Sequence, residues 1–409
     1  MIHSTMSLFG KTSISGDVYP FLEDISWACW PSYRRISLAD GGDFEATFTF
    51  SAADDILEKW FENYLGARFV EVCEGHPAFE GRLERMVLSY NGKVLSRDLA
   101  EVFNSVRVRY QTDSSASKAV TSAATDDDSI AAWGTRELVE NAEVYLSSTS
   151  AALYAANLLA RLKEPRVHSD TVRVGGEYQP GQLQVTVRGY VRSLMADLYQ
   201  SGSTAEDNAD AEVSAALSGA DFVTAGDIDA NTLQVKEEAD YVPGWTRIKN
   251  IAALGDSSGN EWQAGCYQGT SLDYQQRDLE TVIYFVETQA NRRLTLVRDT
   301  NGFEVPPPLV RPGVMAFSND IMPGLPMASP LLDDPRAIFI ARVTYDRNGV
   351  VIDGLDPDVR NAAFQIALDH YLTAPPDIRW TGENAPKPAP PPVVMVPPTG
   401  GLPGGRGPR

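Results

Sequence analysis

Apolar and polar positions in the first 115 residues alternate as in strands, except in one segment with the spacing of a helix. There the apolar side chains share one helical face: Ile56, Leu57, Trp60, Phe61 and Tyr64. Ser51 and Asp54 have the spacing of a capping box, in which the serine hydroxyl accepts a backbone hydrogen bond. Gly66 supplies a left-handed stop. Burial of these side chains contributes on the order of 10 kcal/mol before entropic costs, so we expect the helix to cover a core.

Strands and tight turns are predicted around this helix. Residues 86–90 and 93–96 flank Asn91-Gly92, a dipeptide that tolerates positive φ at both turn positions and indicates a hairpin. From residue 106 to residue 110, valine and tyrosine alternate with arginine, which is typical of a strand with one wet face. Residues 1–115 are therefore predicted to form a small barrel or open sheet closed by one helix.

Residues 116–200 combine helical and strand-like patterns and are predicted to form an insertion domain. Asp126, Asp127 and Asp128 carry the negative charge that favours a helix N-terminus. Ser148 or Ser150 is expected to cap a second helix, which ends before Pro165. The apolar face of this helix would hold Ala151, Tyr154, Ala155, Leu158 and Leu162.

The next segment, residues 201–240, interleaves acidic residues with Ala, Ser, Thr and Gly and holds few large apolar residues. It is predicted to be a solvated acidic loop or linker. Residues 241–385 are strand-rich again, and Asn301-Gly302 and Asn348-Gly349 each follow a strand-like run, which indicates two more hairpins. Asp356-Pro357 is a typical helix start, so a helix of about four turns is expected after it.

The C-terminal residues 386–409 are rich in proline and then in glycine. Such a sequence forms neither a sheet ladder nor a helix and is predicted to be extended, polyproline-like chain. Two interpretations remain open for it. The segment is either a flexible tail or an arm that becomes ordered on a neighbouring subunit. In the second case the contact residues would be Pro390, Pro391, Pro392, Val393 and Val394.

Charge and cysteine content narrow the classes of function. The net charge of −20 disfavours specific nucleic-acid binding, because phosphate contacts need clustered Lys and Arg. The acidic excess indicates a self-repelling soluble surface, or an acidic lumen past which DNA slides. Three widely spaced cysteines, Cys29, Cys73 and Cys266, are expected to be buried thiols rather than a disulfide framework. No signal peptide and no membrane span are predicted.

One enzyme motif occurs in the chain. Gly255-Asp-Ser257-Ser-Gly259 matches the G-x-S-x-G nucleophile elbow of serine hydrolases, with Asp353 or Asp369 and then His370 in the required order. The elbow needs a strand before the serine and a helix after it, whereas two glycines and no helical stripe follow Ser257. We therefore interpret the segment as a polar turn and expect no catalytic residues.

The sequence gives only weak evidence for a metal site or for cleavage of glycosides. Cys73 and His76 have a plausible spacing for zinc, but no second pair of ligands accompanies them. Carboxylates next to aromatic residues, as in Asp240-Tyr241 and Glu261-Trp262, are expected by chance in a chain with 55 acidic residues. We therefore predict a chain without metal or cofactor that is not an enzyme.

Several short motifs, in order along the chain, resemble the hub domain of bacteriophage tails and related injection machines. Phe69-Val-Glu-Val72 and the block from Phe79 to Met86 resemble a strand ending in F-x-G-x-I/L that leads into a hairpin. The block from Asp128 to Glu137 resembles the S-I-x-x-Y-G-x-R-E element found after the first hub barrel, with Trp133 as the aromatic residue. The later segments 247–256 and 265–269 resemble siphophage minor tail proteins.

This resemblance implies an α+β, β-rich fold with two β-barrel-like hub domains, small helical insertions and an extended proline-rich C-terminal arm. It implies a structural virion protein, made in the bacterial host cytoplasm, that links the tail tube to distal tip or fibre proteins and allows genome passage. The expected partners are copies of the same chain, a trimer being favoured, and tube, distal tail or spike proteins. The 201–240 segment and the proline-rich end depart from contractile-tail members, which leaves the position in the tail open.

Two other functions compete with this one. A receptor- or glycan-binding tip module would display an exposed aromatic platform, for which Trp27, Trp30 and Tyr33 are candidates, although such clusters more often lie in cores or interfaces. A serine hydrolase using Ser257 is the third interpretation.

Overall fold

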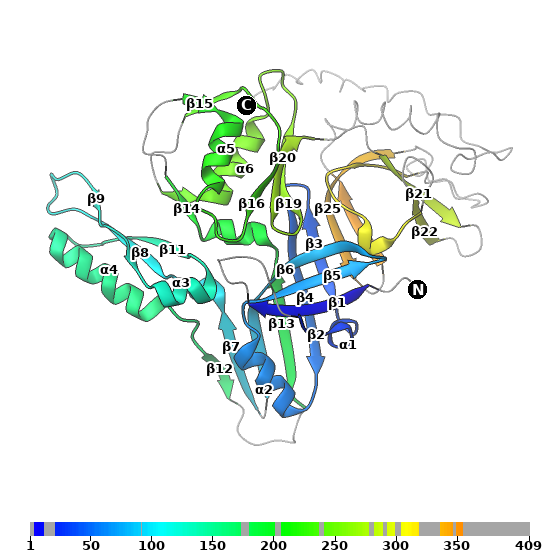
Figure 1. Cartoon of the computed structure of the whole chain (residues 1–409), viewed down its shortest axis with the longest axis horizontal. Helices are drawn as coiled ribbons and strands as arrows, with labels where there is room; N and C mark the ends of the chain where they lie inside the picture. Colours follow the sequence, from blue (N-terminus) through cyan, green and yellow to red (C-terminus); the bar gives the residue numbers. More distant parts are fainter. Residues whose placement is uncertain are drawn as a thin grey trace, which may run out of the picture.

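The computed structural model describes residues 4–11, 21–90, 92–172, 180–200, 206–236, 241–277, 282–288, 293–298, 304–318, 336–346 and 349–354. The chain is rich in strands with a smaller share of helices, and a curled half-barrel sheet lies at its centre (Figure 1). The β-rich α+β class expected from the sequence is confirmed. The predicted helix after Asp356 and the proline-rich residues 386–409 lie outside the described residues.

The half-barrel consists of antiparallel strands in the order β2–β1–β5–β6–β13–β4–β3–β25. In that order the strands are Phe21–Asp24, Thr5–Lys11, Ala67–Cys73, His76–Tyr90, Gln182–Arg188, Gly41–Ser51, Arg34–Leu38 and Arg336–Asp346. The long strand β6 pairs with β5 through its first half and with β13 through its second half. It therefore carries the sheet around its bend.

Helices α1 (Ser26–Cys29) and α2 (Asp54–Asn63) pack on this sheet. The predicted stripe of α2 is largely confirmed, because Leu57, Trp60 and Phe61 are buried in the first core, although Ile56 is 37% exposed. The predicted capping box is wrong. Ser51 belongs to the β4 ladder opposite Gln182, and the helix begins after Ala53 without a side-chain cap.

The predicted hairpins are present. Strands β6 and β7 (Lys93–Asp98) pair with Tyr90 opposite Lys93, and β12 (His168–Val172) continues the sheet beyond β7. Strand β25 pairs with β26 (Gly349–Gly354), and β22 (Arg293–Arg298) pairs with β23 (Glu304–Val305). Strands β21 (Val282–Thr288) and β24 (Met315–Ser318) connect β22 to β25, and η3 (Pro307–Leu309) lies between β23 and β24 in the chain.

An insertion subdomain, residues 105–162, projects from the half-barrel (Figure 1). Strand β8 (Ser105–Tyr110) pairs with β9 (Ala119–Val120), β10 (Ala124–Thr125) and β11 (Glu137–Asn141), and η1 (Leu99–Glu101) precedes it. Helix α3 (Asp127–Trp133) is capped by Asp126, which accepts from the Ser129 amide at 2.9 Å. Its acidic start is therefore confirmed.

Helix α4 (Ser148–Leu162) covers β8 with the predicted buried residues Ala151, Ala155 and Leu158. Its cap differs from the prediction by one residue. Ser147 is the N-cap, and its hydroxyl accepts a hydrogen bond from the Ser150 amide at 3.1 Å. Three serines, at 147, 148 and 150, precede residue 151, which explains why spacing alone did not select the cap.

A second core subdomain, residues 190–276, has its own apolar cluster. Its elements are η2 (Tyr190–Met195), β14 (Leu198–Tyr199), β15 (Glu206–Asn208), α5 (Ala209–Leu217), β16 (Thr224–Ile228), β17 (Gln234–Lys236), β18 (Val242–Pro243), α6 (Gly244–Leu254), β19 (Trp262–Gln268) and β20 (Ser271–Gln276). The main strands pair in the order β16–β20–β19, and β19 meets β4 of the half-barrel.

The prediction that residues 201–240 form a solvated linker is wrong for the described part of that segment. Helix α5 lies within it and buries Ala209, Val213 and Leu217 in the second core. The helix packs against α6, where Ile248 and Ile251 are buried. Alanine-rich helices approach each other closely and need few large side chains. The scarcity of large apolar residues was therefore a poor guide to exposure here.

The two sheets approach closely where β4 meets β19. A Cβ atom added to Gly42, whose φ is +71°, would lie 2.1 Å from the carbonyl oxygen of Cys266. Gly265 of β19 faces the same contact, because its added Cβ would lie 2.6 Å from the Gly42 nitrogen. Only glycine fits this backbone-to-backbone contact between the half-barrel and the second core.

We predict that Gly42→Ala lowers the free energy of unfolding by more than about 3 kcal/mol, since backbone strain adds to a steric clash. Gly75 is the matched control, because its φ is +83° and an added Cβ meets nothing within 4 Å. Gly75→Ala should cost only about 1–2 kcal/mol. Urea unfolding monitored by tryptophan fluorescence measures both values. Equal losses in the two variants would contradict the close contact.

Candidate functional site

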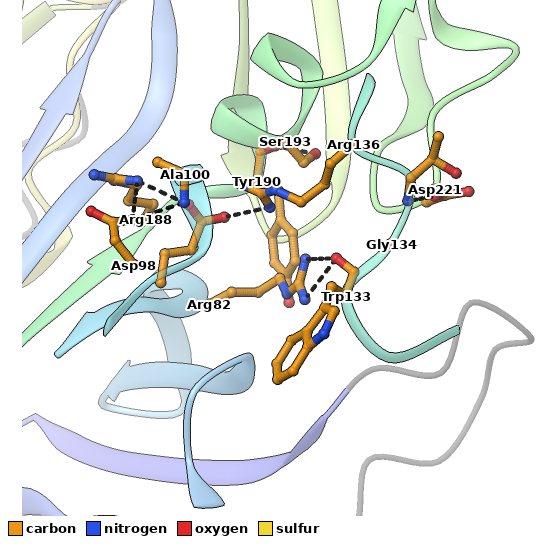
Figure 2. Close-up of polar contacts among 12 residues, drawn as sticks. Arg82, Asp98, Ala100, Trp133, Gly134, Arg136, Arg188, Tyr190, Ser193 and Asp221 are labelled. Atoms are coloured by element: carbon orange, nitrogen blue, oxygen red, sulfur yellow. Dashed lines mark hydrogen bonds and ion pairs between the residues drawn. The ribbon is translucent and has the colours of Figure 1, made fainter. Parts of the chain in front are cut away.

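The half-barrel, the insertion subdomain and the second core meet at one buried junction. We define the junction as segment 133–137 together with the side chains that surround it: Arg82, Glu84, Asn104, Arg188, Asp197, Asp221 and Phe222. Figure 2 shows Arg82, Trp133, Arg136, Arg188 and Asp221 converging there. The segment belongs to the block from Asp128 to Glu137 that the sequence singled out.

A single carboxylate on β6 lies among three arginines. Glu84 is buried; its Oε1 lies 3.7 Å from Nη1 of Arg136 and its Oε2 lies 3.2 Å from Nη1 of Arg188. Arg188 also reaches Asp98, with 3.3 Å between its Nη1 and the aspartate Oδ1. In the β6–β13 ladder Arg188 is directly opposite Arg82. Like charges at paired positions repel, so Glu84 offsets this repulsion.

The surroundings of Glu84 lower its pKa below the ordinary glutamate value. Burial acts in the opposite direction by disfavouring the charged form, but the guanidinium groups of Arg136, Arg82 and Arg188 outweigh it. Glu84 is therefore ionised at neutral pH. Its contribution to stability is present above the ordinary glutamate pKa and is lost as the pH falls through its lowered folded-state value.

Arg82 joins the first core to the second. Its Nη1 and Nη2 donate to the carbonyl oxygen of Trp133 at 3.3 and 3.4 Å, and its guanidinium carbon lies 3.9 Å from the centre of the Phe222 ring. Trp133 belongs to the first core and Phe222 to the second. Gly134, with φ +79°, passes between them, and an added Cβ would lie 2.0 Å from Phe222. A side chain at position 134 would separate the two cores.

Hydrogen bonds to its backbone hold segment 133–137 on both sides. Toward the insertion subdomain, the Arg136 amide donates to Oδ1 of Asn104 at 2.8 Å, and Nδ2 of Asn104 donates to the Gly134 carbonyl at 2.8 Å. Toward the second core, the Thr135 amide donates to Asp221 and the Glu137 amide donates to the Ala196 carbonyl at 2.8 Å.

Glu137 completes the connection with its side chain. Its Oε1 lies 2.6 Å from Nη1 of Arg107 within the insertion subdomain, and its Oε2 accepts from the Leu198 amide of β14 at 2.9 Å. The motif residues that the sequence singled out therefore fix the relative placement of three parts of the chain. Buried, mutually paired charges of this kind favour one arrangement of the elements that carry them.

The G-x-S-x-G match at residues 255–259 does not have the geometry of a nucleophile elbow. Ser257 is exposed in a turn, with helix α6 before it and strand β19 after it, which is the reverse of the strand–turn–helix order. Asp256 shapes this turn by accepting from the amides of Ser258 and Asn260. These bonds, with the Asn260 side chain foremost, lower the pKa of Asp256 to about 2. Asp369 and His370 lie outside the described residues.

The remaining sequence candidates are placed as follows. Cys73 is buried at the end of β5, and His76 is exposed opposite it. Within the described part of the chain, no three His, Cys, Asp or Glu side chains are grouped to hold a metal ion.

No helix in the described part of the chain is long and apolar enough to cross a membrane. The proposed contact residues Pro390, Pro391, Pro392, Val393 and Val394 lie outside the described ranges.

The three aromatic residues considered for a glycan platform do not share one surface. Trp27 is 51% exposed and meets Phe50 edge to face. Tyr33 is buried in the first core, and its hydroxyl donates to Oε2 of Glu71 at 2.9 Å. Burial, followed by the charge of Glu71, raises the pKa of Tyr33 well above its usual value. Tyr33 therefore stabilises the half-barrel and is not available to a sugar.

No family model matches the chain, and no curated protein is significantly similar to it in sequence.

We predict that Glu84→Gln destabilises the protein by about 3–5 kcal/mol, because it leaves buried arginines without their carboxylate. Glu101 provides the control, since its side chain is 54% exposed and pairs with His168 at the surface. Glu101→Gln should change the free energy of unfolding by less than about 0.5 kcal/mol. Chemical denaturation at pH 7 gives both numbers. A loss below about 1 kcal/mol for Glu84→Gln would contradict the role of this carboxylate.

Proposed function

We propose that the chain is a structural virion protein, a hub at the tip of a bacteriophage tail that links the tail tube to distal tip or fibre proteins. The observation that carries this proposal is the position of the motif residues. Residues of the two principal blocks that resemble tail hubs, around Arg82 and around Trp133, lie together in the buried junction. Residues that hold the subdomains of one chain together support a fixed architecture, which a hub that acts through its interfaces would need.

The finer architecture belongs to the same proposal. The curled half-barrel would be the first of two barrel-like hub domains, and the strands from β19 to β24 would contribute to the second. The proline-rich residues 386–409 would extend to a neighbouring copy, with Pro390 to Val394 as the contact. The protein would act without cofactor or catalysis, as one protomer of a ring, with a trimer favoured, and genome would pass the acidic lumen without sticking.

Exposed apolar side chains support a role in assembly. Four apolar side chains are exposed just before helix α4 and near its start: Val144, Tyr145, Leu153 and Tyr154. We call these four residues the apolar tip. No charged residue occurs from Val144 to Ala160, in a chain that carries a net charge of −20. Copies of such a chain repel one another, and an uncharged surface contributes least to that repulsion. Exposed apolar surface, where it forms a contiguous patch, commonly marks an interface.

The proposed ring is tested by native mass spectrometry of the purified full chain, with the tail-tube protein of the same virion added in a second experiment. We expect a species of three times the chain mass of 44.6 kDa, or a complex with the tube protein. A chain that stays monomeric alone and with the tube protein would contradict the hub. Binding of the monomer to a glycan array would then favour the receptor-binding alternative.

We predict that the double variant Tyr145→Glu, Leu153→Glu shifts the assembly toward monomer by at least tenfold in dissociation constant, since desolvating two new carboxylates opposes association. Val351→Glu is the control, because Val351 is 60% exposed on β26 and outside the apolar tip. Analytical ultracentrifugation compares the two. Equal dissociation constants for both variants would exclude the apolar tip from the interface.

A further inference from the structure

Asp197 is one of the junction residues, and its burial sets it apart. It lies between η2 and β14, in the short link that connects the two elements. Its backbone amide donates to the Ser193 carbonyl at 3.2 Å, and its carbonyl accepts from the Gly244 amide at the start of α6 at 2.8 Å. The residues on either side of it, Ala196 and Leu198, are the two that Glu137 binds. The backbone at Asp197 is therefore held from both directions.

The carboxyl group of Asp197 is buried without full hydrogen bonding. Its residue is 8% exposed, and its Oδ2 atom has no hydrogen-bond partner among the described residues. A buried carboxylate oxygen without a donor is costly when it is charged and much less costly when it carries a proton.

Charges around Asp197 act in both directions. Asp221 of the second core and Glu137 of β11 bring negative charge, and Arg136 and Arg82 bring positive charge. Both arginines are already engaged, Arg136 with Glu84 and Arg82 with the Trp133 carbonyl. Among the other charged side chains on the elements packed here, Arg188 pairs with Glu84 and Asp98, Arg107 with Glu137, and Arg247 with Glu212. Arg192 of η2 lies over the ring of Phe44 instead.

These surroundings favour the neutral acid. Burial, followed by the charges of Asp221 and Glu137, raises the pKa of Asp197 to about 8. The two carboxylates that raise it are the same two that accept backbone hydrogen bonds across the junction. A third negative charge between them would oppose the contacts that join the insertion subdomain to the second core.

We propose that Asp197 is a proton-dependent latch: the junction closes with this carboxyl group protonated, and loss of the proton loosens the packing of the second core against the insertion subdomain. The latch is a property of the fold and does not depend on the proposed tail-hub function. It would make the relative placement of the subdomains sensitive to mildly alkaline conditions and to any cation that offsets the new charge.

The sign of the pH dependence follows from the raised pKa. Between the ordinary aspartate value and about 8, the folded chain retains a proton that the unfolded chain releases. The equilibrium constant for unfolding therefore rises with pH, by up to tenfold per pH unit from this one group, and stops rising above about 8. Burial also raises the pKa of Asp43 to about 7, so the interval from pH 7 to pH 8 isolates Asp197 best.

The test compares urea unfolding of the full chain at pH 6, 7, 8 and 9 for the wild type, Asp197→Asn and Asp273→Asn. Asp273 is the control because its pKa is also raised by burial but it lies on β20, where it accepts from the Asp227 amide. We expect Asp197→Asn to remove a several-fold rise in the unfolding constant between pH 7 and pH 8, and Asp273→Asn to retain it. An unchanged rise in Asp197→Asn would overturn the proposal.

A second measurement tests the proposal even if Asp197→Asn does not fold. Carbon-13 NMR of the wild type follows the side-chain carboxyl of Asp197 directly through the titration. A midpoint near pH 8, with the amide signals of Leu198 and Gly244 shifting at the same midpoint, supports the latch. A midpoint in the ordinary aspartate range, or a carboxyl titration that leaves both amides unmoved, would overturn it.

Discussion

Arg82, Arg136 and Arg188 converge on the carboxylate of Glu84 in a space from which water is largely excluded, and the placement of three subdomains depends on this group. A charge removed from water must be paired with good geometry or the fold loses several kcal/mol. Here the pairing partners come from β6, β13 and the segment before β11. The charges can all be satisfied only when those three elements are in their observed positions.

Close backbone contacts act together with this charge network. The contact between Gly42 and Cys266 joins the half-barrel to the second core. The contact between Gly134 and Phe222 joins the insertion segment to the same core. Apolar clusters supply the larger share of the stabilising free energy, but each cluster is mostly internal to its own subdomain. The polar junction and the glycine contacts therefore determine how the clusters are arranged, which matters for a protein proposed to act through its interfaces.

Local features were predictable from the sequence, and long-range ones were not. Residues close together in the chain determine three of these features: the apolar stripe of α2, the acidic start of α3 and the hairpins. The spacing of residue types was therefore sufficient to predict them. The cap of α2 failed because the β4 ladder holds Ser51, and α5 was missed because its alanine-rich face packs closely on α6. The block around Trp133 was singled out by its motif, whereas Asn104, Asp197 and Asp221 gave no local signal. Their roles come from contacts with residues far away in the chain.

Native-state hydrogen exchange of the junction amides tests the central claim most directly. The amides of Arg136, Glu137, Leu198 and Gly244 all donate across or beside the junction. If the buried charges hold the three subdomains as one unit, these amides exchange with the same free energy of opening as the amides of β6 and β13. Exchange of the four amides through a local opening, far faster than that of the two strands, would contradict the account.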